Sequence, residues 1–234
     1  MKEKLCLVTG VGEGTGAAIV RRFASDGYTV AMLSRDQERL RTYESEHPQA
    51  VAFPCDLEDL QALGQTIEQV QVELGNPTVI IHNAVRATFD RLLDSDPSEL
   101  ERNFRVNTTS LLYLAKAFVP TMLEQGSGSI IATGNTAAFR GVPTYALFAP
   151  TKAAQRIFLE SLARDFGPQG IHVAYVNIDA VIDVPWTRDR FASDKPDEFF
   201  ITPHSIADEV FHIAHQPRDA WSFNVELRPY AERW

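Results

Sequence analysis

The sequence has few cysteines, no excess of positive charge and no long apolar run. Its two cysteines, Cys6 and Cys55, fall in or just after predicted core strands, so we expect free buried thiols, as in a reducing cytosol. With 22 basic and 31 acidic residues the formal net charge is −9, and no basic cluster forms. This argues against nucleic acid or anionic lipid as a partner. No apolar run approaches the ~18 residues of a membrane span, and the strand pattern that begins at residue 4 leaves no room for a signal peptide. We therefore expect a cytoplasmic protein.

Strand and helix patterns alternate along the whole chain. At 234 residues and 44% hydrophobic content, it can bury a large core as one domain, residues 1–234. The alternation predicts βαβ units, and hence a doubly wound α/β (Rossmann) fold whose seven-stranded parallel sheet has helices on both faces. The expected strands are 4–8, 28–33, 50–53, 78–82, 129–133, 171–176 and 223–227. The main expected helices are 36–46, 59–74, 96 to about 122, 149–166 and 203 to about 215. Residues 183–203 fit no strand pattern and are expected to form a mobile lid.

A glycine-rich stretch, residues 9–16, follows the first predicted strand and leads directly into a helix. Its glycines are Gly10, Gly12, Gly14 and Gly16. Glycines at such a turn let the backbone bend sharply and let a diphosphate approach closely. The free N–H groups and the dipole of the new helix then favour the negative charge of the phosphates. With a further strand following, this arrangement predicts a dinucleotide-binding site.

Several marks, in order along the chain, resemble the short-chain dehydrogenase/reductase family. Besides the glycine stretch, they are Asp56 after the third strand, the run His82-Asn83-Ala84-Val85 after the fourth, Asn107 within a helix and Lys152 at the start of another. The resemblance covers essentially the whole chain. It implies an oxidoreductase acting on a small molecule with a nicotinamide dinucleotide, assembled as a homo-oligomer (dimer or tetramer) through the two long central helices.

The resemblance also implies a set of cofactor-binding residues. In the family, the counterpart of Asp56 contacts the adenine, and the Asn83-Ala84 pair supports the nicotinamide side. Ile182 aligns with the residue whose backbone binds the carboxamide. The full expected set is Gly10, Gly12, Glu13, Gly14, Thr15, Gly16, Ser34, Arg35, Asp56, Leu57, Asn83, Ala84, Lys152 and Ile182.

The end of the second strand bears on the choice of cofactor. An acid there binds the ribose 2′-OH of NAD, whereas a base accepts the 2′-phosphate of NADP. Ser34 takes the acid position and Arg35 follows, which favours NADP(H). Two features argue for NAD(H): Glu13 stands where many NADP-preferring relatives carry Arg, and Asp36 takes the 2′-OH if the strand ends later. We expect NADP(H), with NAD(H) as the alternative, and no metal ion.

The catalytic positions depart from the family pattern. In the family, a Tyr four residues before the Lys exchanges a proton with the substrate, and a Ser thirteen residues before the Tyr binds the substrate carbonyl. Counted from Lys152, these positions hold Phe148 and Asn135. Phe148 cannot donate a proton, whereas the Asn135 amide still donates a hydrogen bond. Lys152, which binds the nicotinamide ribose in the family, and Asn107, which holds a relay water there, are retained.

A replacement proton donor is needed if the protein turns substrate over. Tyr145, three residues before Phe148, is the first candidate, although a role at the pocket rim or at a subunit interface stays open. Weaker candidates are His82, Asp179, Asp183 and His204. The expected catalytic set is therefore Asn107, Asn135, Lys152 and Tyr145.

The substitutions resemble a divergent subgroup of the family with Phe in place of the Tyr. We expect an NADP(H)-dependent oxidoreductase that acts on a small apolar carbonyl or enoyl compound. The apolar lid residues agree with such a substrate: Pro185, Trp186, Phe191, Phe199 and Phe200. Two alternatives stay open. One is a catalytically silent NADP(H)-binding sensor or partner subunit, and the other is a lyase, isomerase or dehalogenase-type activity, which the intact glycine stretch disfavours.

Overall fold

A parallel sheet organises the computed structural model, which describes residues 4–191 and 194–231. Its strand order is β3-β2-β1-β4-β5-β6-β9, and every neighbouring pair runs parallel. The predicted doubly wound α/β fold with seven parallel strands is confirmed. The strands are β1 (Leu5–Thr9), β2 (Thr29–Ser34), β3 (Ala50–Pro54), β4 (Val79–His82), β5 (Gly128–Asn135), β6 (Ile171–Ile178) and β9 (Asn224–Leu227).

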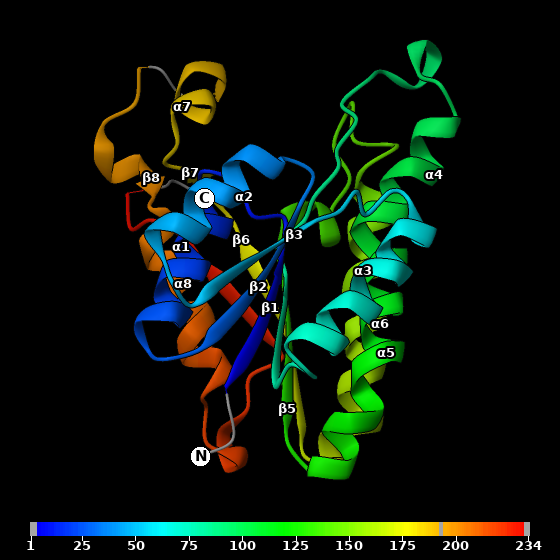
Figure 1. The fold of residues 1–234 in the computed structure, drawn as a ribbon. Coiled ribbons are helices and arrows are strands. Elements are labelled where there is room, and N and C mark those ends of the chain that lie inside the picture. The colour runs from blue at the N-terminus through cyan, green and yellow to red at the C-terminus, as the bar shows by residue number, and fades with distance from the viewer. Residues whose placement is uncertain (1–3, 192–193, 232–234) are drawn as a thin grey trace.

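Helices cover both faces of the sheet (Figure 1). On one face lie α1 (Thr15–Ser25), α2 (Gln37–Glu46) and α8 (Pro203–Ala214), and on the other lie α3 (Leu60–Glu73), α5 (Ser110–Gln125) and α6 (Ala149–Phe166). Successive residues of β1 divide between the two cores: Leu5 and Leu7 join one, and Cys6 and Val8 the other. Side chains of a strand alternate between faces, so a strand buried on both faces reads as a continuous apolar run.

Two predicted segments differ from the structure. The helix expected from residue 96 to about 122 is divided into α4 (Ser98–Phe104), a π-helical turn (Arg105–Thr109) and α5. The segment 183–203, expected to hold no strand, contains β8 (Phe200–Ile201), which pairs with β7 (Val181–Ile182), and α7 (Pro185–Phe191) lies between them. Strands of two residues are too short to show an alternating pattern, which is why the prediction missed them. Short 3₁₀ turns complete the elements, at Leu92–Asp94, Thr136–Ala138, Gly167–Gln169, Asp197–Phe199 and Arg218–Ala220.

Two expectations from composition can be compared with the structure. Cys6 and Cys55 are both buried free cysteines, as predicted, and burial raises the pKa of each thiol. In the part of the chain that the structure describes, none of the helices is both long enough and apolar enough to span a bilayer.

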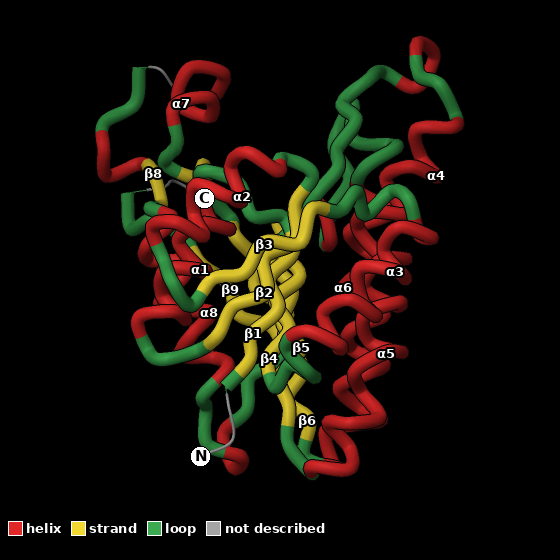
Figure 2. Tube along the Cα trace, viewed as in Figure 1, coloured by secondary structure: helices red, strands yellow, loops and turns green. Residues whose placement is uncertain are grey.

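The strand order reverses at β1, which lies between β2 and β4. In open α/β sheets, ligands bind outside the carboxyl ends of the strands at such a reversal. The loops that follow these strands lie together at the upper end of the sheet in Figure 2. The fold therefore places the glycine stretch after β1 at the expected binding edge.

Candidate functional site

A cavity of about 480 Å³ lies at the carboxyl ends of β1, β2 and β4. The structure gathers around it every expected cofactor-binding residue except Lys152. These are Gly10, Gly12, Glu13, Gly14, Thr15, Gly16, Ser34, Arg35, Asp56, Leu57, Asn83, Ala84 and Ile182. The sequence prediction did not include several other lining residues, among them Arg39, Arg86, Val184, Trp186 and Thr187.

The glycine stretch is tightly packed on its protein side and open on its cavity side. Gly10 has a φ of +69°, and a Cβ there would lie 2.5 Å from Cα of Ala84. A Cβ on Gly16 would lie 2.4 Å from the carbonyl oxygen of Gly10. A Cβ on Gly12, in contrast, would meet nothing within 4 Å. Since α1 begins at Thr15, its unpaired N–H groups lie beside this open space.

The donors beside the glycine stretch fit a dinucleotide diphosphate. The Thr15 hydroxyl is buried and has no hydrogen-bond partner within the described residues. A buried hydroxyl without a partner is costly, and a phosphate oxygen would satisfy it. The first turn of α1 carries no acidic side chain that would oppose an anion. Residues 10–16 and the start of α1 would therefore hold the diphosphate.

β2 extends one residue beyond the predicted strand end at residue 33. β2 ends at Ser34, so Asp36 becomes the N-cap of α2, and its carboxylate accepts from the backbone N–H of Arg39 at 3.0 Å. That carboxylate also lies 3.2 Å from the Arg39 guanidinium. Asp36 therefore lies beyond the strand as a helix cap, and it is not among the residues that line the cavity. Arg39 lines the cavity beside Arg35 and donates to Glu13 at 3.2 Å.

Asn83 joins the end of β4 to both neighbouring strands. Its amide nitrogen donates to the carbonyl oxygen of Gly10 at 2.9 Å, and its amide oxygen accepts from the Thr133 hydroxyl at 2.9 Å. The backbone N–H of Ala84 donates to the Thr9 hydroxyl at 3.3 Å. These bonds fix the glycine stretch, β4 and β5 relative to one another on the expected nicotinamide side.

Comparison with known proteins agrees with this geometry. The chain matches the family model described as short chain dehydrogenase over residues 4–193. It belongs to the short-chain dehydrogenase family. An uncharacterized oxidoreductase of Staphylococcus aureus is 26% identical over 231 residues, which cover 98% of each chain. A metagenomic short-chain oxidoreductase solved in complex with NADP is 28% identical, with a TM-score of 0.83 and 97% of each chain covered. An alcohol dehydrogenase of the archaeon Thermococcus sibiricus, complexed with 5-hydroxy-NADP, has the same fold, with 24% identity, a TM-score of 0.85 and 99% of each chain covered.

In this short-chain dehydrogenase, Lys152 lies behind the cavity wall. Only 1% of it is exposed, and its Nζ donates to the carbonyl oxygen of Thr133 at 3.3 Å and to Oε1 of Gln155. Burial lowers the pKa of Lys152 to about 7. Thr133 connects it to the cavity, because the Thr133 hydroxyl donates to Asn83.

The side chain of Asn107 is bound to the backbone. Its amide oxygen accepts from the N–H of Arg86 at 2.9 Å, and its amide nitrogen donates to the Arg86 carbonyl and to the Thr151 hydroxyl, both at 2.8 Å. These bonds satisfy a polar amide on a buried helix face. The backbone carbonyl oxygen of Asn107 accepts from the Gln155 side-chain nitrogen at 2.5 Å.

An aromatic cluster occupies the position of the family tyrosine. Phe148 is 2% exposed, and its ring centroid lies 5.5 Å from that of Phe89 and 5.8 Å from that of Tyr145. Tyr145 is half-buried in the loop before α6, as expected, and is not among the residues that line the 480 Å³ cavity. Asn135 ends β5, and its side-chain oxygen accepts from the N–H of Ala137 at 3.1 Å.

The weaker acid/base candidates are buried or paired with other residues, away from the cavity. His82 is fully buried, and burial and the charge of Lys152 lower its pKa to about 3, so its ring is neutral. Asp179 pairs with Arg228, and Asp183 pairs with Arg188, which lowers the pKa of Asp183. His204 is exposed and lies 3.2 Å from Asp208. None of the four lines the 480 Å³ cavity, and the described residues hold no cluster of His, Cys, Asp or Glu suited to a metal ion.

The first part of the lid borders the cavity. The lid residues Val184, Trp186 and Thr187 line it next to Ile182 of β7, and the Thr187 hydroxyl donates to the carbonyl oxygens of Ile182 and Val184. This hydroxyl holds the start of α7 against β7. Phe200 is buried under the Arg188 guanidinium. The side chain of Phe191 and residues 192–193 lie outside what the structure describes.

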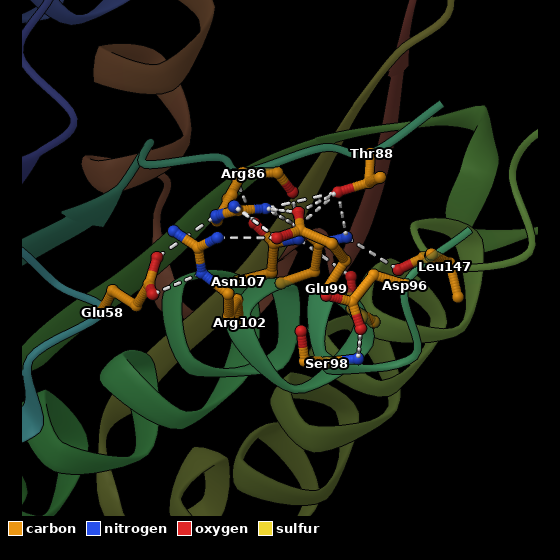
Figure 3. Close-up of polar contacts among 11 residues, drawn as sticks. Glu58, Arg86, Thr88, Asp96, Ser98, Glu99, Arg102, Asn107 and Leu147 are labelled. Atoms are coloured by element: carbon orange, nitrogen blue, oxygen red, sulfur yellow. Dashed lines mark hydrogen bonds and ion pairs between the residues drawn. The ribbon is translucent and has the colours of Figure 1, made fainter. Parts of the chain in front are cut away.

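Arg86, which also lines the cavity, belongs to the polar network that Figure 3 shows. The Arg86 guanidinium donates to Glu99 at 2.7 Å, to Asn103 at 2.9 Å and to Glu58 at 3.2 Å. Arg102 donates to both Glu58 and Glu99 at 2.6 Å. These pairs hold the pKa of Glu58 and of Glu99 below the usual range. Because Asn103 also donates to the carbonyl oxygen of Leu147 at 2.9 Å, the network joins the loop after β4 to α4 and to the segment before α6.

Proposed function

We propose that this short-chain dehydrogenase is an NADP(H)-dependent oxidoreductase. The observation that carries the proposal is the pair of guanidinium groups, Arg35 and Arg39, on the cavity wall beside Ser34. Ser34 stands where an acid would bind the ribose 2′-OH of NAD, and guanidinium groups bind phosphate oxygens strongly and in a directed way. The 28%-identical short-chain oxidoreductase solved with NADP supports the same choice.

The carboxylates next to Arg39 do not exclude a 2′-phosphate. The Glu13 side chain is 72% exposed and that of Asp36 is 42% exposed. Ion pairs to exposed carboxylates contribute little, since water and salt screen them. A phosphate group with nearly two negative charges therefore competes well for the Arg39 guanidinium.

When bound, the nicotinamide supplies or accepts a hydride. The residues of this chain orient it and shape the space beside it. Val85, Val184 and Trp186 give the adjoining wall an apolar character, which supports a small apolar carbonyl or enoyl substrate. We propose that Asn107, Asn135, Lys152 and Tyr145 form the catalytic set, as in a divergent subgroup with Phe at the tyrosine position; Asn107 and Lys152 are retained, and Asn135 and Tyr145 take the roles of the family's Ser and Tyr. Tyr145 is the proton donor in this proposal, since it is the tyrosine whose ring packs against Phe148 at the family tyrosine position, although it lies outside the 480 Å³ cavity.

Turnover tests this proposal. Purified protein with NADPH is offered aldehydes, ketones and enoyl compounds, and loss of NADPH absorbance is followed. We expect oxidation with at least one class, and a rate ~10²–10⁴ lower in Tyr145→Phe, the usual contribution of an acid/base group. Tyr230→Phe, at a position that is 88% exposed, is the matched control and keeps the parent rate. An unchanged rate in Tyr145→Phe means that Tyr145 is not the proton donor.

A catalytically silent NADP(H)-binding sensor or partner subunit is the second candidate. The burial of both Phe148 and Lys152 favours it, because neither residue offers a proton to the cavity. This function predicts tight NADPH binding with no oxidation across the panel. Phe148→Tyr separates the two candidates: activity gained where the parent has none shows an intact pocket that has lost only its acid.

We also propose a homo-oligomer built through α5 and α6. Leu112 and Tyr113 on α5 and Ile157 on α6 are exposed apolar residues on the two longest helices of the described chain. Association would remove this apolar surface from water. Light scattering that reports a dimer or tetramer supports the proposal, and a monomer at all concentrations contradicts it.

A further inference from the structure

Gln155 provides one of two carbonyl-type acceptors around the amine of Lys152. Nζ of Lys152 donates to the carbonyl oxygen of Thr133 and to Oε1 of Gln155. Gln155 is fully buried, three residues beyond Lys152 on α6, so both side chains lie on the same face of that helix. Fully buried glutamines are uncommon, and this one lines no part of the 480 Å³ cavity.

The groups around Gln155 determine which way its amide points. Its nitrogen donates to the carbonyl oxygen of Asn107 at 2.5 Å, and a backbone carbonyl can only accept. The same nitrogen lies 3.1 Å from Nδ1 of His82, and with its second N–H as the donor Nδ1 is the acceptor. His82 then carries its proton on Nε2 and donates to the Ser110 hydroxyl at 2.9 Å, and that hydroxyl donates to the Val106 carbonyl at 2.7 Å. Every donor in this buried series of hydrogen bonds therefore has an acceptor. Oε1 of Gln155 is left to face Lys152.

We propose that Gln155 is the positioning residue of Lys152. Its amide oxygen, oriented by Asn107 and His82, fixes the lysine amine beside Thr133 at the end of β5. The proposal rests on the proposed function in one respect, because Lys152 is the group expected to meet the nicotinamide ribose. Gln155 itself lines no part of the cavity, and among the expected cofactor-binding and catalytic residues it bonds to Lys152 and to the Asn107 carbonyl.

A positioning contact has an electrostatic signature that simple core filling lacks. Burial lowers the pKa of Lys152 to about 7, and an acceptor at Gln155 favours the charged amine. The other ionisable group in this chain of hydrogen bonds is His82, which stays neutral because burial and Lys152 lower its pKa to about 3. A carboxylate at position 155 therefore raises the pKa of Lys152, and a hydrocarbon there lowers it.

The test is an NMR titration of the lysine side chains in the full chain without cofactor. Lys152→Met identifies the Lys152 signal by its loss. Gln155→Glu is expected to raise the pKa of Lys152 above that of the parent, and Gln155→Leu to lower it. Gln69→Leu is the matched control, because Gln69 is an exposed helical glutamine bonded to Glu73, and it leaves the pKa unchanged. Equal pKa values in the parent and both Gln155 variants overturn the proposal.

The parent protein gives a second readout in case a variant does not fold. ¹⁵N shifts of the His82 ring are expected to show the proton on Nε2 and none on Nδ1 at neutral pH. A proton on Nδ1 contradicts the proposal, since Gln155 would then turn its oxygen to His82 and its nitrogen to Lys152.

NADPH affinity of the Gln155 variants distinguishes failure of the proposal from failure of the proposed function. We expect Gln155→Leu to bind NADPH ~10-fold more weakly than the parent, while Gln69→Leu binds as the parent does. Shifts in the pKa of Lys152 with unchanged NADPH affinity support the positioning role and overturn the ribose contact of Lys152. Unchanged pKa values overturn the positioning role whatever the affinity.

Discussion

The guanidinium of Arg39 lies 3.2 Å from the carboxylate of Glu13 and so joins α2 to the glycine stretch. Both residues line the cavity, with Arg35 beside them. Glu13 stands where many NADP-preferring relatives carry Arg, and in this chain a helix residue brings a guanidinium to the same place. Cofactor preference therefore depends on how a few partly exposed charges balance around Ser34.

Removing either guanidinium should weaken NADPH binding selectively. We expect Arg35→Ala and Arg39→Ala each to raise the Kd for NADPH ~10-fold, the usual loss for a charge-assisted hydrogen bond, and to leave the Kd for NADH nearly unchanged. Isothermal titration calorimetry measures both constants. Arg41→Ala, on the exposed side of α2, is the control and should change neither. If the Kd values for NADPH and NADH rise by the same factor, these arginines do not bind the 2′-phosphate.

Removing the carboxylate of Glu13 should have the opposite effect. Glu13→Gln takes away a negative charge that repels a 2′-phosphate and frees Arg39 to bind it. We expect the Kd for NADPH to fall by ~3-fold, within the range of exposed ion pairs, with no change for NADH. If NADH binding weakens instead, Glu13 binds the ribose and the cofactor assignment is reversed.

Two glycines of the same stretch should separate stability from binding. A Cβ on Gly16 would lie only 2.4 Å from the Gly10 carbonyl oxygen. Gly16→Ala is therefore expected to lower the free energy of unfolding by ~1–3 kcal/mol. Gly12→Ala meets no protein atom within 4 Å and should unfold as the parent does, yet bind NADPH more weakly because the methyl group enters the cavity. Urea titration and calorimetry measure the two effects. Weak binding with normal stability in both variants would contradict this packing.

Burial of Lys152 should make stability depend on pH. Its folded pKa is about 7, below the ordinary lysine value of 10.5, so between these values the unfolded chain binds a proton that the folded chain does not. Stability then rises with pH. From about pH 7 to about pH 8.5, we expect the free energy of unfolding to rise by ~1–2 kcal/mol more in the parent than in Lys152→Met. His172, with a lowered pKa, acts below this window. Parallel pH profiles for the two proteins in urea titrations would show that Lys152 is charged or exposed when folded.

The sequence predicts well those features whose residues lie close together along the chain. The glycine spacing, the strand before it and the Ser34-Arg35 pair after the next strand all lie within short stretches of chain, and the structure brings these residues around one cavity. Asn107 is recognisable in the sequence as a retained family position, and in the structure its buried amide binds the Arg86 backbone. The helix break at Arg105–Thr109 was missed, because one π-turn hardly disturbs an apolar stripe.

Features made by residues far apart in the chain were not predicted. Arg39 meets Glu13 across 26 positions, and Gln155 meets His82 across 73. Arg86 and Arg102 meet Glu58 only after the loops following β3 and β4 come together with α4. Side chains of these types are common on exposed helices, so their spacing alone gave no signal.

The most direct test of the account is the affinity of the unmodified full chain for NADPH and for NADH, measured by calorimetry at one salt concentration. The cavity beside Ser34, Arg35 and Arg39 predicts that both cofactors bind and that NADPH binds at least ~10-fold more tightly. NADH binding as tightly as NADPH, or no binding of either, would contradict the account.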